Sequence, residues 1–347
     1  MDKFVNYLKQ YNQDLDPVIE KIFNNERKKV SKIAPIAGSL VDDYKNFLGG
    51  GKKLRGCEIL LGYEIFGGKD KKEALLASLV IEIIHSFLLI HDDIMDQDTL
   101  RRGKPTMHKI YEKEFGRHYG ISMAIDIGDE GIFFAYRLLN SLNFPPESLS
   151  SVTYFLSRLL MEVGLGQALD ITYEEEGRFS EKNALEVHRY KTAEYTIPGP
   201  LSIGAMLAGA DDESLKAIKQ FGIPVGVAFQ IRDDELGMFS SEEQLGKPVD
   251  SDLRESKVTV LIVKALEKAK GDDLEFLKHC YGNHNLKKEE VERVKNIIKK
   301  VGALQYSHSL GRKLVEKGKK FIPQITGNPR YQKLLTDLAD FVLERES

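Results

Sequence analysis

Apolar residues recur at spacings of three and four along most of the chain, whereas sustained two-residue alternation is scarce. This spacing places apolar side chains on one face of an α-helix, so it predicts helices rather than strands. The clearest stretches are residues 4–23, 57–66, 152–169, 215–239, 258–266, 291–301 and 334–342. Pro and Gly mark turns or kinks between them, as at residues 49–51, 103–105, 144–146, 198–200 and 246–248. We predict an all-α helical bundle that forms a single domain, residues 1–347, with peripheral helices at residues 271–347.

The most apolar stretch, residues 74–90, is long enough to raise the question of a membrane span. It contains polar groups, among them Glu82 and His85, and several acids follow it directly. A helix that is apolar all round can instead be buried among other helices. We therefore expect a buried core helix and a protein that is not transmembrane.

Two apolar stretches run directly into acidic residues. Residues 74–90 lead to Asp92, Asp93 and Asp96, and residues 221–231 lead to Asp233 and Asp234. On a helix, carboxylates four residues apart repel each other by roughly 0.2–0.5 kcal/mol, which a bound cation would offset. Carboxylates without Cys nearby favour Mg²⁺, which takes its other ligands from water and phosphate. Two facing helices of this kind would form a metal-binding mouth.

Composition narrows the possible functions. The chain of 347 residues is 42% apolar, which is enough for a large core, and its net charge of −3 gives no positive field for nucleic acid. Its two cysteines, Cys57 and Cys280, are far apart in the sequence, and the N-terminus lacks an apolar signal segment. We therefore expect a reducing, cytoplasmic location.

Basic residues accompany the acids along the sequence. Arg binds phosphate oxygens through its planar fork, and Lys binds them as a compact charge. The turn of three glycines before Lys52 lacks the P-loop pattern, so it does not predict a nucleotide site. The basic residues concerned are Lys52, Lys53, Arg55, Arg101, Arg102, Lys191, Lys247 and Lys257.

Over nearly its full length, and in the same motif order, the chain resembles trans-type isoprenyl diphosphate synthases of the polyprenyl synthetase family. Residues 51–55 resemble the clamp for isopentenyl diphosphate, residues 82–85 the segment of its binding histidine, and residues 92–96 the first aspartate-rich motif. The remaining matches are residues 100–103, 166–170, 191–192, 229–234, 245–248 and 257–259. Together these motifs are highly specific.

The resemblance implies helices around a central cavity, a homodimer, and roles for particular residues. Isopentenyl diphosphate would bind Lys52, Arg55, His85 and Arg102. The allylic diphosphate would bind Arg101, Lys191, Lys247 and Lys257. Mg²⁺, expected as about three ions, would bind Asp92, Asp96 and Asp233, with support from Asp93, Gln167, Asp170 and Asp234. In catalysis, Thr192, Gln230 and backbone carbonyl groups near a kink at Lys191 would favour an allylic cation.

The chain departs from the family pattern at two glycines. Gly237 replaces the third aspartate of the second motif, and Glu235 cannot substitute because it lies on another helix face. Archaeal- and actinobacterial-type members share this glycine, so we expect activity to survive. Gly56 replaces a common proline after the clamp arginine, and we expect it to affect only local rigidity.

Product length should depend on the side chains below the first motif. Phe87 lies five positions before Asp92, about 7.5 Å along a helix, where an aromatic ring could stop a growing tail. Leu88, one position nearer, is not aromatic, a combination that resembles archaeal-type geranylgeranyl diphosphate synthases. We therefore predict a C20 product. A C15 product, a mixture, or Phe87 as ordinary core remain the alternatives.

Three other functions compete with this prediction. Glu82 and His85 form one Glu-x-x-His motif, but a di-iron site needs a second copy. A terpene cyclase would share the first aspartate motif without needing Lys52, Arg55 and His85. A non-catalytic prenyltransferase subunit would be expected to lose acids or basic residues that this chain retains. The remaining histidines, His188 and His308 among them, lack metal spacing and receive no role.

Overall fold

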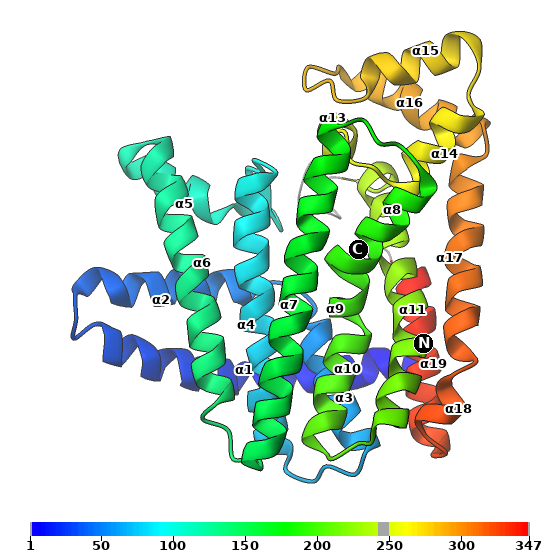
Figure 1. Ribbon diagram of the computed structural model, residues 1–347. Coiled ribbons are helices and arrows are strands. Elements are labelled where there is room, and N and C mark those ends of the chain that lie inside the picture. The colour runs from blue at the N-terminus through cyan, green and yellow to red at the C-terminus, as the bar shows by residue number, and fades with distance from the viewer. Residues whose placement is uncertain (1, 242–249, 346–347) are drawn as a thin grey trace. The chain divides into compact units, whose positions relative to one another are not determined.

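The computed structural model describes residues 2–241 and 250–345 (Figure 1). The chain forms two compact units. The N-terminal unit comprises Val5–Phe155 and Pro200–Asp211, and the C-terminal unit comprises Met1–Phe4, Leu156–Gly199 and Asp212–Ser347. The predicted all-α class is confirmed, because helices account for nearly all regular structure in the described residues. The single domain stays a prediction.

Helix α4, the predicted core helix, organises the N-terminal unit by packing against α3 and α6. Its Ile81, Ile83 and Ile84 side chains are fully buried. A short antiparallel hairpin follows α4 and pairs Arg101 with Lys104. The elements are α1 (Asp2–Val30), α2 (Pro35–Leu48), α3 (Leu54–Ile65), α4 (Lys71–Met95), β1 (Leu100–Arg101), β2 (Lys104–Pro105), α5 (Met107–Phe115), α6 (Arg117–Leu139), the start of α7 (Pro146–Glu175) and most of α10 (Pro198–Leu207).

The sequence of α4 explains both of its ends. The Asp70 side chain accepts a hydrogen bond from the Glu73 backbone N–H at 3.1 Å, which caps the first turn. Among the described residues, α4 alone is long and apolar enough to span a membrane, and 67% of its most apolar window is buried. That burial is typical of a helix in the core of a protein rather than of a membrane span. The helix ends at Met95, within the first acidic cluster.

In the C-terminal unit, α11 packs against the long helix α17, the last helix α19 and a π-helical segment, η1. The elements are the rest of α7, α8 (Glu181–Val187), η1 (His188–Ala193), α9 (Glu194–Thr196), α11 (Asp212–Phe239), α13 (Ser251–Arg254), α14 (Val260–Lys268), α15 (Gly271–Cys280), α16 (Lys288–Lys300), α17 (Ala303–Lys319), α18 (Ile322–Ile325) and α19 (Pro329–Glu344). The helices predicted for residues 271–347 are present in its described part.

The π-helix η1 fits between two glycines of neighbouring helices. A side chain at Gly166 of α7 would collide with the Lys191 backbone, and a Cβ atom at Gly226 of α11 would lie 2.6 Å from the Ala193 carbonyl oxygen. Single π-turns inside helices are rare and occur often at functional sites. The segment carries Lys191 and Thr192, so its π-turns lie where the family resemblance implies a kink.

Candidate active site

The first acidic cluster lies at the C-terminal end of α4. The Asp96 backbone N–H donates to the Asp92 carbonyl at 2.8 Å, so the helical spacing of these two residues is real. Both side chains are partly exposed, whereas Asp93 is fully buried. The two predicted metal ligands therefore remain accessible on one helix face.

Arg101 of the hairpin is the cation that this cluster already contains. Its Nε atom donates to Asp93 Oδ1 at 2.6 Å, and its Nη2 atom lies 3.6 Å from Asp98 and 4.0 Å from Asp92. Burial raises the pKa of Asp93 to about 6, although Arg101 opposes that rise. The hairpin thus compensates the buried carboxylate with a fixed guanidinium group.

The structure brings together side chains that the sequence assigned to isopentenyl diphosphate. Arg55 Nη1 lies 3.2 Å from His85 Nε2, across α3 and α4. Arg102 donates to the carbonyl oxygen of Phe47, near the end of α2, and to that of Gly50, in the turn just before Lys52. Two α-helices and one turn therefore gather cationic groups in the N-terminal unit.

The glycine turn before Lys52 is required by the position of Arg102. A Cβ atom at Gly50 would lie 2.9 Å from the Arg102 guanidinium, and one at Gly51 would lie 2.6 Å from it. Gly51 also has a φ of +101°, which residues with a side chain rarely adopt. The turn is therefore a close-packing site for an arginine, which agrees with the absence of a P-loop pattern.

Glu82 is a site residue to which sequence analysis gave no role in binding. It is buried on α4, and one oxygen accepts the Gly56 backbone N–H at 2.7 Å. Burial raises the pKa of Glu82, and the positive charges of Arg55, Lys53 and Arg102 oppose that rise. The carboxyl group therefore links the start of α3 to the cationic groups around it.

The expectation that Gly56 affects only local rigidity is wrong. A proline would lack the N–H that Glu82 accepts, and any Cβ atom there would collide with the Tyr11 hydroxyl. That hydroxyl donates to Ser78 at 3.0 Å, which fixes Tyr11 against α4. Gly56 is needed because Tyr11, α3 and α4 approach one another closely.

In the C-terminal unit, Asp170 joins two of the predicted diphosphate ligands. Its Oδ2 atom lies 2.7 Å from Lys191 Nζ and 3.4 Å from Lys257 Nζ. Lys257 also lies 3.0 Å from Glu174 Oε1, a partner that the sequence did not predict. This group of buried or partly buried charges brings α7, η1 and the turn before α14 together.

The second acidic pair is held by different partners at each carboxylate. Gln230 donates to Asp234 Oδ1 at 2.9 Å, and His188 Nε2 lies 3.0 Å from Asp234 Oδ2. Asp233, which is 40% exposed, lies 2.5 Å from Arg345 Nη2. His188 and Arg345 were missed because neither belongs to a recognised motif.

The structure confirms that Glu235 faces away from the predicted metal ligands of its motif. It lies 3.2 Å from Arg232 and 2.9 Å from His308 of α17. At Gly237, a Cβ atom would lie 3.2 Å from Asp252 Oδ2, so α13 occupies the space beside this position. The predicted ligand Lys247 lies outside the described residues.

The predicted chain-length residue Phe87 lies on α4, facing α6. Its ring is 4.7 Å from the His91 ring, and its Cδ2 atom would be 3.5 Å from a Cβ atom at Gly128. Phe87 and Leu88 are both half-buried, so neither is sealed in the core.

Within residues 2–241 and 250–345, no three His, Cys, Asp or Glu side chains are placed to hold one ion. The predicted ligands nevertheless suit Mg²⁺. Asp92, Asp96 and Asp233 are partly exposed carboxylates, and Mg²⁺ commonly uses one or two carboxylates with water and substrate phosphate. These residues fit a metal that arrives with its phosphate ligands.

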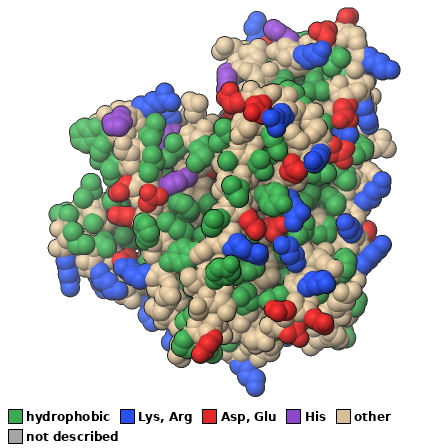
Figure 2. Space-filling model, viewed as in Figure 1, with side chains coloured by type: hydrophobic (Ala, Val, Ile, Leu, Met, Phe, Trp, Pro, Cys, Tyr) green, Lys and Arg blue, Asp and Glu red, His purple; other side chains and the backbone are tan. Residues whose placement is uncertain are grey.

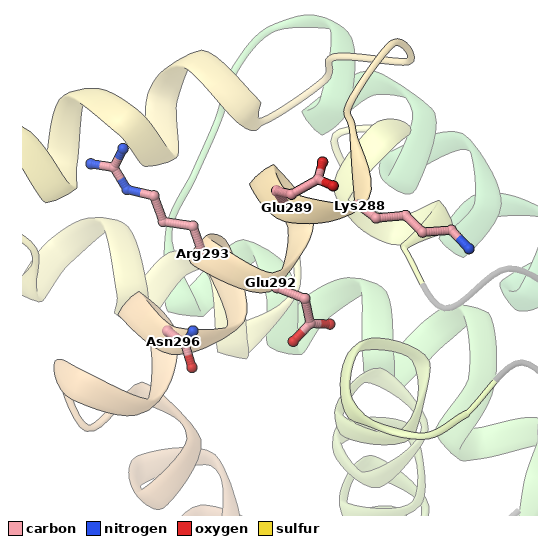
Figure 3. A pocket seen from close by; sticks show the side chains of 5 residues that line it. All are labelled: Lys288, Glu289, Glu292, Arg293 and Asn296. Atoms are coloured by element: carbon pink, nitrogen blue, oxygen red, sulfur yellow. The ribbon is translucent and has the colours of Figure 1, made fainter.

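A surface pocket on α16 contains none of the predicted site residues (Figure 3). Its charged side chains have both signs, and Lys288 and Arg293 point in opposite directions in Figure 3. The lining residues are Lys288, Glu289, Glu292, Arg293 and Asn296. This mixture does not form a focused anion site.

Helices that end in acidic residues, with Lys and Arg beside them, make up an all-α isoprenoid synthase fold. The chain belongs to the polyprenyl synthetase family, whose model matches residues 40–300. The predicted family is therefore confirmed, as is the prediction of a trans-prenyltransferase enzyme.

Individual relatives match nearly the whole chain. It is 33% identical to geranylgeranyl diphosphate synthase of Sulfolobus acidocaldarius, covering 99% of both chains. It is also 33% identical to geranylfarnesyl diphosphate synthase of Aeropyrum pernix, covering 85% of this chain and 91% of the relative. A crystal structure of geranylgeranyl pyrophosphate synthase from Corynebacterium glutamicum, complexed with isoprenyl diphosphate and magnesium, matches with a TM-score of 0.92 and 29% identity, covering 97% of this chain and 99% of that one.

Replacing Gly56 by Ala should destabilise the protein by about 1–3 kcal/mol, because the new methyl group overpacks the contact with Tyr11. Urea unfolding would measure the change. Adding Tyr11→Phe should recover part of the loss, since the two changes share one contact. Gly164→Ala is the matched control, because that exposed glycine of α7 has open space and Ala favours helix by up to about 1 kcal/mol. Equal effects at positions 56 and 164 would contradict the packing argument.

His85 should make stability depend on pH. Burial, reinforced by Arg55 and Arg102, lowers its pKa well below the ordinary value. Below about pH 6.5 the unfolded imidazole binds a proton that the folded one does not, so the unfolded state is favoured as pH falls. Relative to His85→Gln, wild type should lose up to about 1.4 kcal/mol of unfolding free energy per pH unit there. Urea unfolding between pH 7.5 and 5.5 measures this, with exposed His118→Gln as control. Parallel curves for wild type and His85→Gln would refute the assignment.

Proposed function

We propose that the protein is a Mg²⁺-dependent synthase that condenses isopentenyl diphosphate with allylic diphosphates to form geranylgeranyl diphosphate (C20). The observation that carries this proposal is that α4 holds both kinds of group: His85, within 3.2 Å of Arg55, and the Asp92–Asp96 pair at its end. A class I cyclase would need the acids but not the Arg55–His85 pair. The names of the Sulfolobus and Corynebacterium relatives support the same activity.

The basic residues of the two units would bind the two diphosphates. Lys52, Arg55, His85 and Arg102 would hold isopentenyl diphosphate. Burial lowers the pKa of His85, so its neutral ring can accept from Arg55 at Nε2 and orient that guanidinium group. Lys191 and Lys257 would turn from Asp170 to the allylic diphosphate, with Arg101 and Lys247 as further ligands. Exchanging one anionic partner for another keeps each cation paired.

Asp92, Asp96 and Asp233 would hold Mg²⁺, with Asp93, Gln167, Asp170 and Asp234 in support, and about three ions fit the family pattern. Bound Mg²⁺ would neutralise charge that develops on the departing diphosphate. The chain's own cations would stabilise the same charge from fixed positions, which requires little reorganisation during the reaction.

The reaction would begin when the allylic C–O bond breaks, leaving an allylic cation and diphosphate. The double bond of isopentenyl diphosphate would attack the cation, and the departed diphosphate would take the proton that is lost. Thr192 and Gln230 would face the cation. Backbone carbonyl groups of the π-helical turn at Lys191 would face it too, because a π-turn interrupts the regular α-helical hydrogen bonds. Apolar helices would exclude water that could quench the cation.

A cytoplasmic homodimer is part of the same proposal. On α7, Met161 and Leu165 lie four residues apart and are 70% and 64% exposed, and Figure 2 shows hydrophobic side chains at the surface over this helix. Large exposed apolar side chains on one helix face favour a protein partner. The free, buried thiols of Cys57 and Cys280 agree with a reducing compartment.

Purified protein with Mg²⁺, labelled isopentenyl diphosphate and C5, C10 or C15 allylic diphosphates should yield elongated products. Asp92→Asn should lower kcat by about 100-fold or more, because it removes charge stabilisation at the leaving group. Product analysis by chain length measures both effects. Glu289→Gln on α16 is the control for loss of one exposed carboxylate and should keep wild-type activity. No incorporation by wild type with any primer would refute the synthase assignment and favour a cyclase or a non-catalytic subunit.

The product should end at C20, and Phe87→Ala should lengthen it to C25 or beyond by removing the ring below the first motif. A relative with the same 33% identity, from Aeropyrum pernix, is named for the longer geranylfarnesyl (C25) product, which supports the idea that few changes separate the two lengths. Phe134→Ala is the matched control, because this half-buried ring packs on Phe23 rather than on His91. A wild-type product of C15 would correct the predicted length, and unchanged products from Phe87→Ala would make Phe87 ordinary core.

A further inference from the structure

The end of the described chain is fastened to the second acidic pair through Arg345. Its Nη2 atom lies 2.5 Å from Asp233 Oδ1 and donates to the Phe229 carbonyl at 2.9 Å. The guanidinium carbon also lies 3.7 Å from the centre of the Phe229 ring, within the range of a cation–π contact. Phe229 and Asp233 are four residues apart on α11, so one helix face provides all three contacts.

The backbone of Arg345 is fixed as well. Its carbonyl oxygen accepts from Arg232 Nε at 3.3 Å and Nη2 at 3.1 Å. The Arg345 residue is only 8% exposed, whereas the Asp233 side chain is 40% exposed. Arg345 is therefore a buried, anchored cation that contacts one oxygen of Asp233 and leaves much of the carboxylate accessible.

We propose that Arg345 is a positioning residue that makes cation binding at Asp233 depend on a diphosphate. This inference rests on the proposed function, because it takes Asp233 to be a ligand of a divalent cation. Arg345 holds the carboxylate in one orientation and places a positive charge beside it. The diphosphate supplies the negative charge that then favours the divalent cation.

Two opposing effects decide whether Arg345 strengthens or weakens cation binding at Asp233. Holding Asp233 in one rotamer favours the cation, but a short carboxylate side chain has little rotamer freedom to lose. The guanidinium charge disfavours a second cation at the same carboxylate, and this repulsion is strong where water is partly excluded. The repulsion is the larger effect, so the cation should bind Asp233 weakly until diphosphate oxygens share its charge.

The test uses Mn²⁺ as the probe, since its free concentration is measured directly by electron paramagnetic resonance. The full-length chain would be titrated with Mn²⁺ alone and with inorganic pyrophosphate present. Arg345→Gln and Arg345→Met both remove the charge, and Met retains apolar packing on the Phe229 ring. Arg345→Lys keeps the charge without the fork. Arg330→Gln, an exposed arginine at the other end of α19, is the matched control.

Either neutral variant should bind Mn²⁺ alone about tenfold more tightly than wild type, and pyrophosphate should narrow the difference. Arg345→Lys and Arg330→Gln should stay within about twofold of wild type. In an Asp233→Asn background, removing the charge at position 345 should change nothing. Thermal unfolding of each variant checks its fold, and Met gives a second neutral variant if Gln fails to fold.

Unchanged or weaker Mn²⁺ binding by both neutral variants would overturn the inference, since a purely structural role lowers only the unfolding temperature. The proposed function fails separately. If Asp233→Asn leaves Mn²⁺ binding unchanged, Asp233 is not a cation ligand and the role of Arg345 falls, whereas the synthase activity can still stand. If wild type does not condense isopentenyl diphosphate, the proposed function falls. If those two tests succeed and the charge at position 345 has no effect, only the role of Arg345 is wrong.

Discussion

The constraint that governs this structure is that charges placed on apolar helices must be paired. Removing a carboxylate or ammonium group from water costs several kcal/mol unless an opposite charge and hydrogen bonds replace the solvent. Asp93 is fully buried at the end of α4 and lies against Arg101. Asp170 is buried on α7 and lies between Lys191 and Lys257. The hairpin after α4 supplies Arg101 to the first of these pairs, and the π-helix η1 supplies Lys191 to the second.

Pairing within the protein also prepares the site for phosphate chemistry. Arg101, Lys191 and Lys257 each lie against a carboxylate, so under the proposed function substrate binding would exchange that partner for a diphosphate oxygen. Compensation is incomplete at Asp93, because burial raises its pKa to about 6 despite Arg101. A carboxylate that remains costly to ionise gains from a further cation nearby. Under the proposed function, a bound cation would supply part of the compensation that Arg101 leaves incomplete.

Much of the site was predictable because its chemistry is local in sequence. The spacing of Asp92 and Asp96 follows from helical geometry, and the apolar run before them marks a buried helix. Helix α6 (Arg117–Leu139) was not among the stretches predicted to be helical. The hairpin residues Leu100–Arg101 and Lys104–Pro105 were missed as strands because two-residue strands leave no periodic pattern. Gly56 was misjudged for another reason. The space that a side chain at this position would need is filled by Tyr11, which lies far away in the sequence.

The contacts that sequence could not predict are those between elements distant in the chain, where one residue has no repeating signal. Arg345 lies 112 positions after Asp233, and nothing in the intervening helices indicates that the two meet. His188 likewise finds Asp234 only because η1 and α11 pack together. Both partners act on residues of one motif, yet in different ways: Asp234 is buried and held by Gln230, whereas Asp233 keeps an accessible carboxylate beside a buried guanidinium. A motif specifies which carboxylates are present, and the tertiary packing around them decides how much of their charge is available to a ligand.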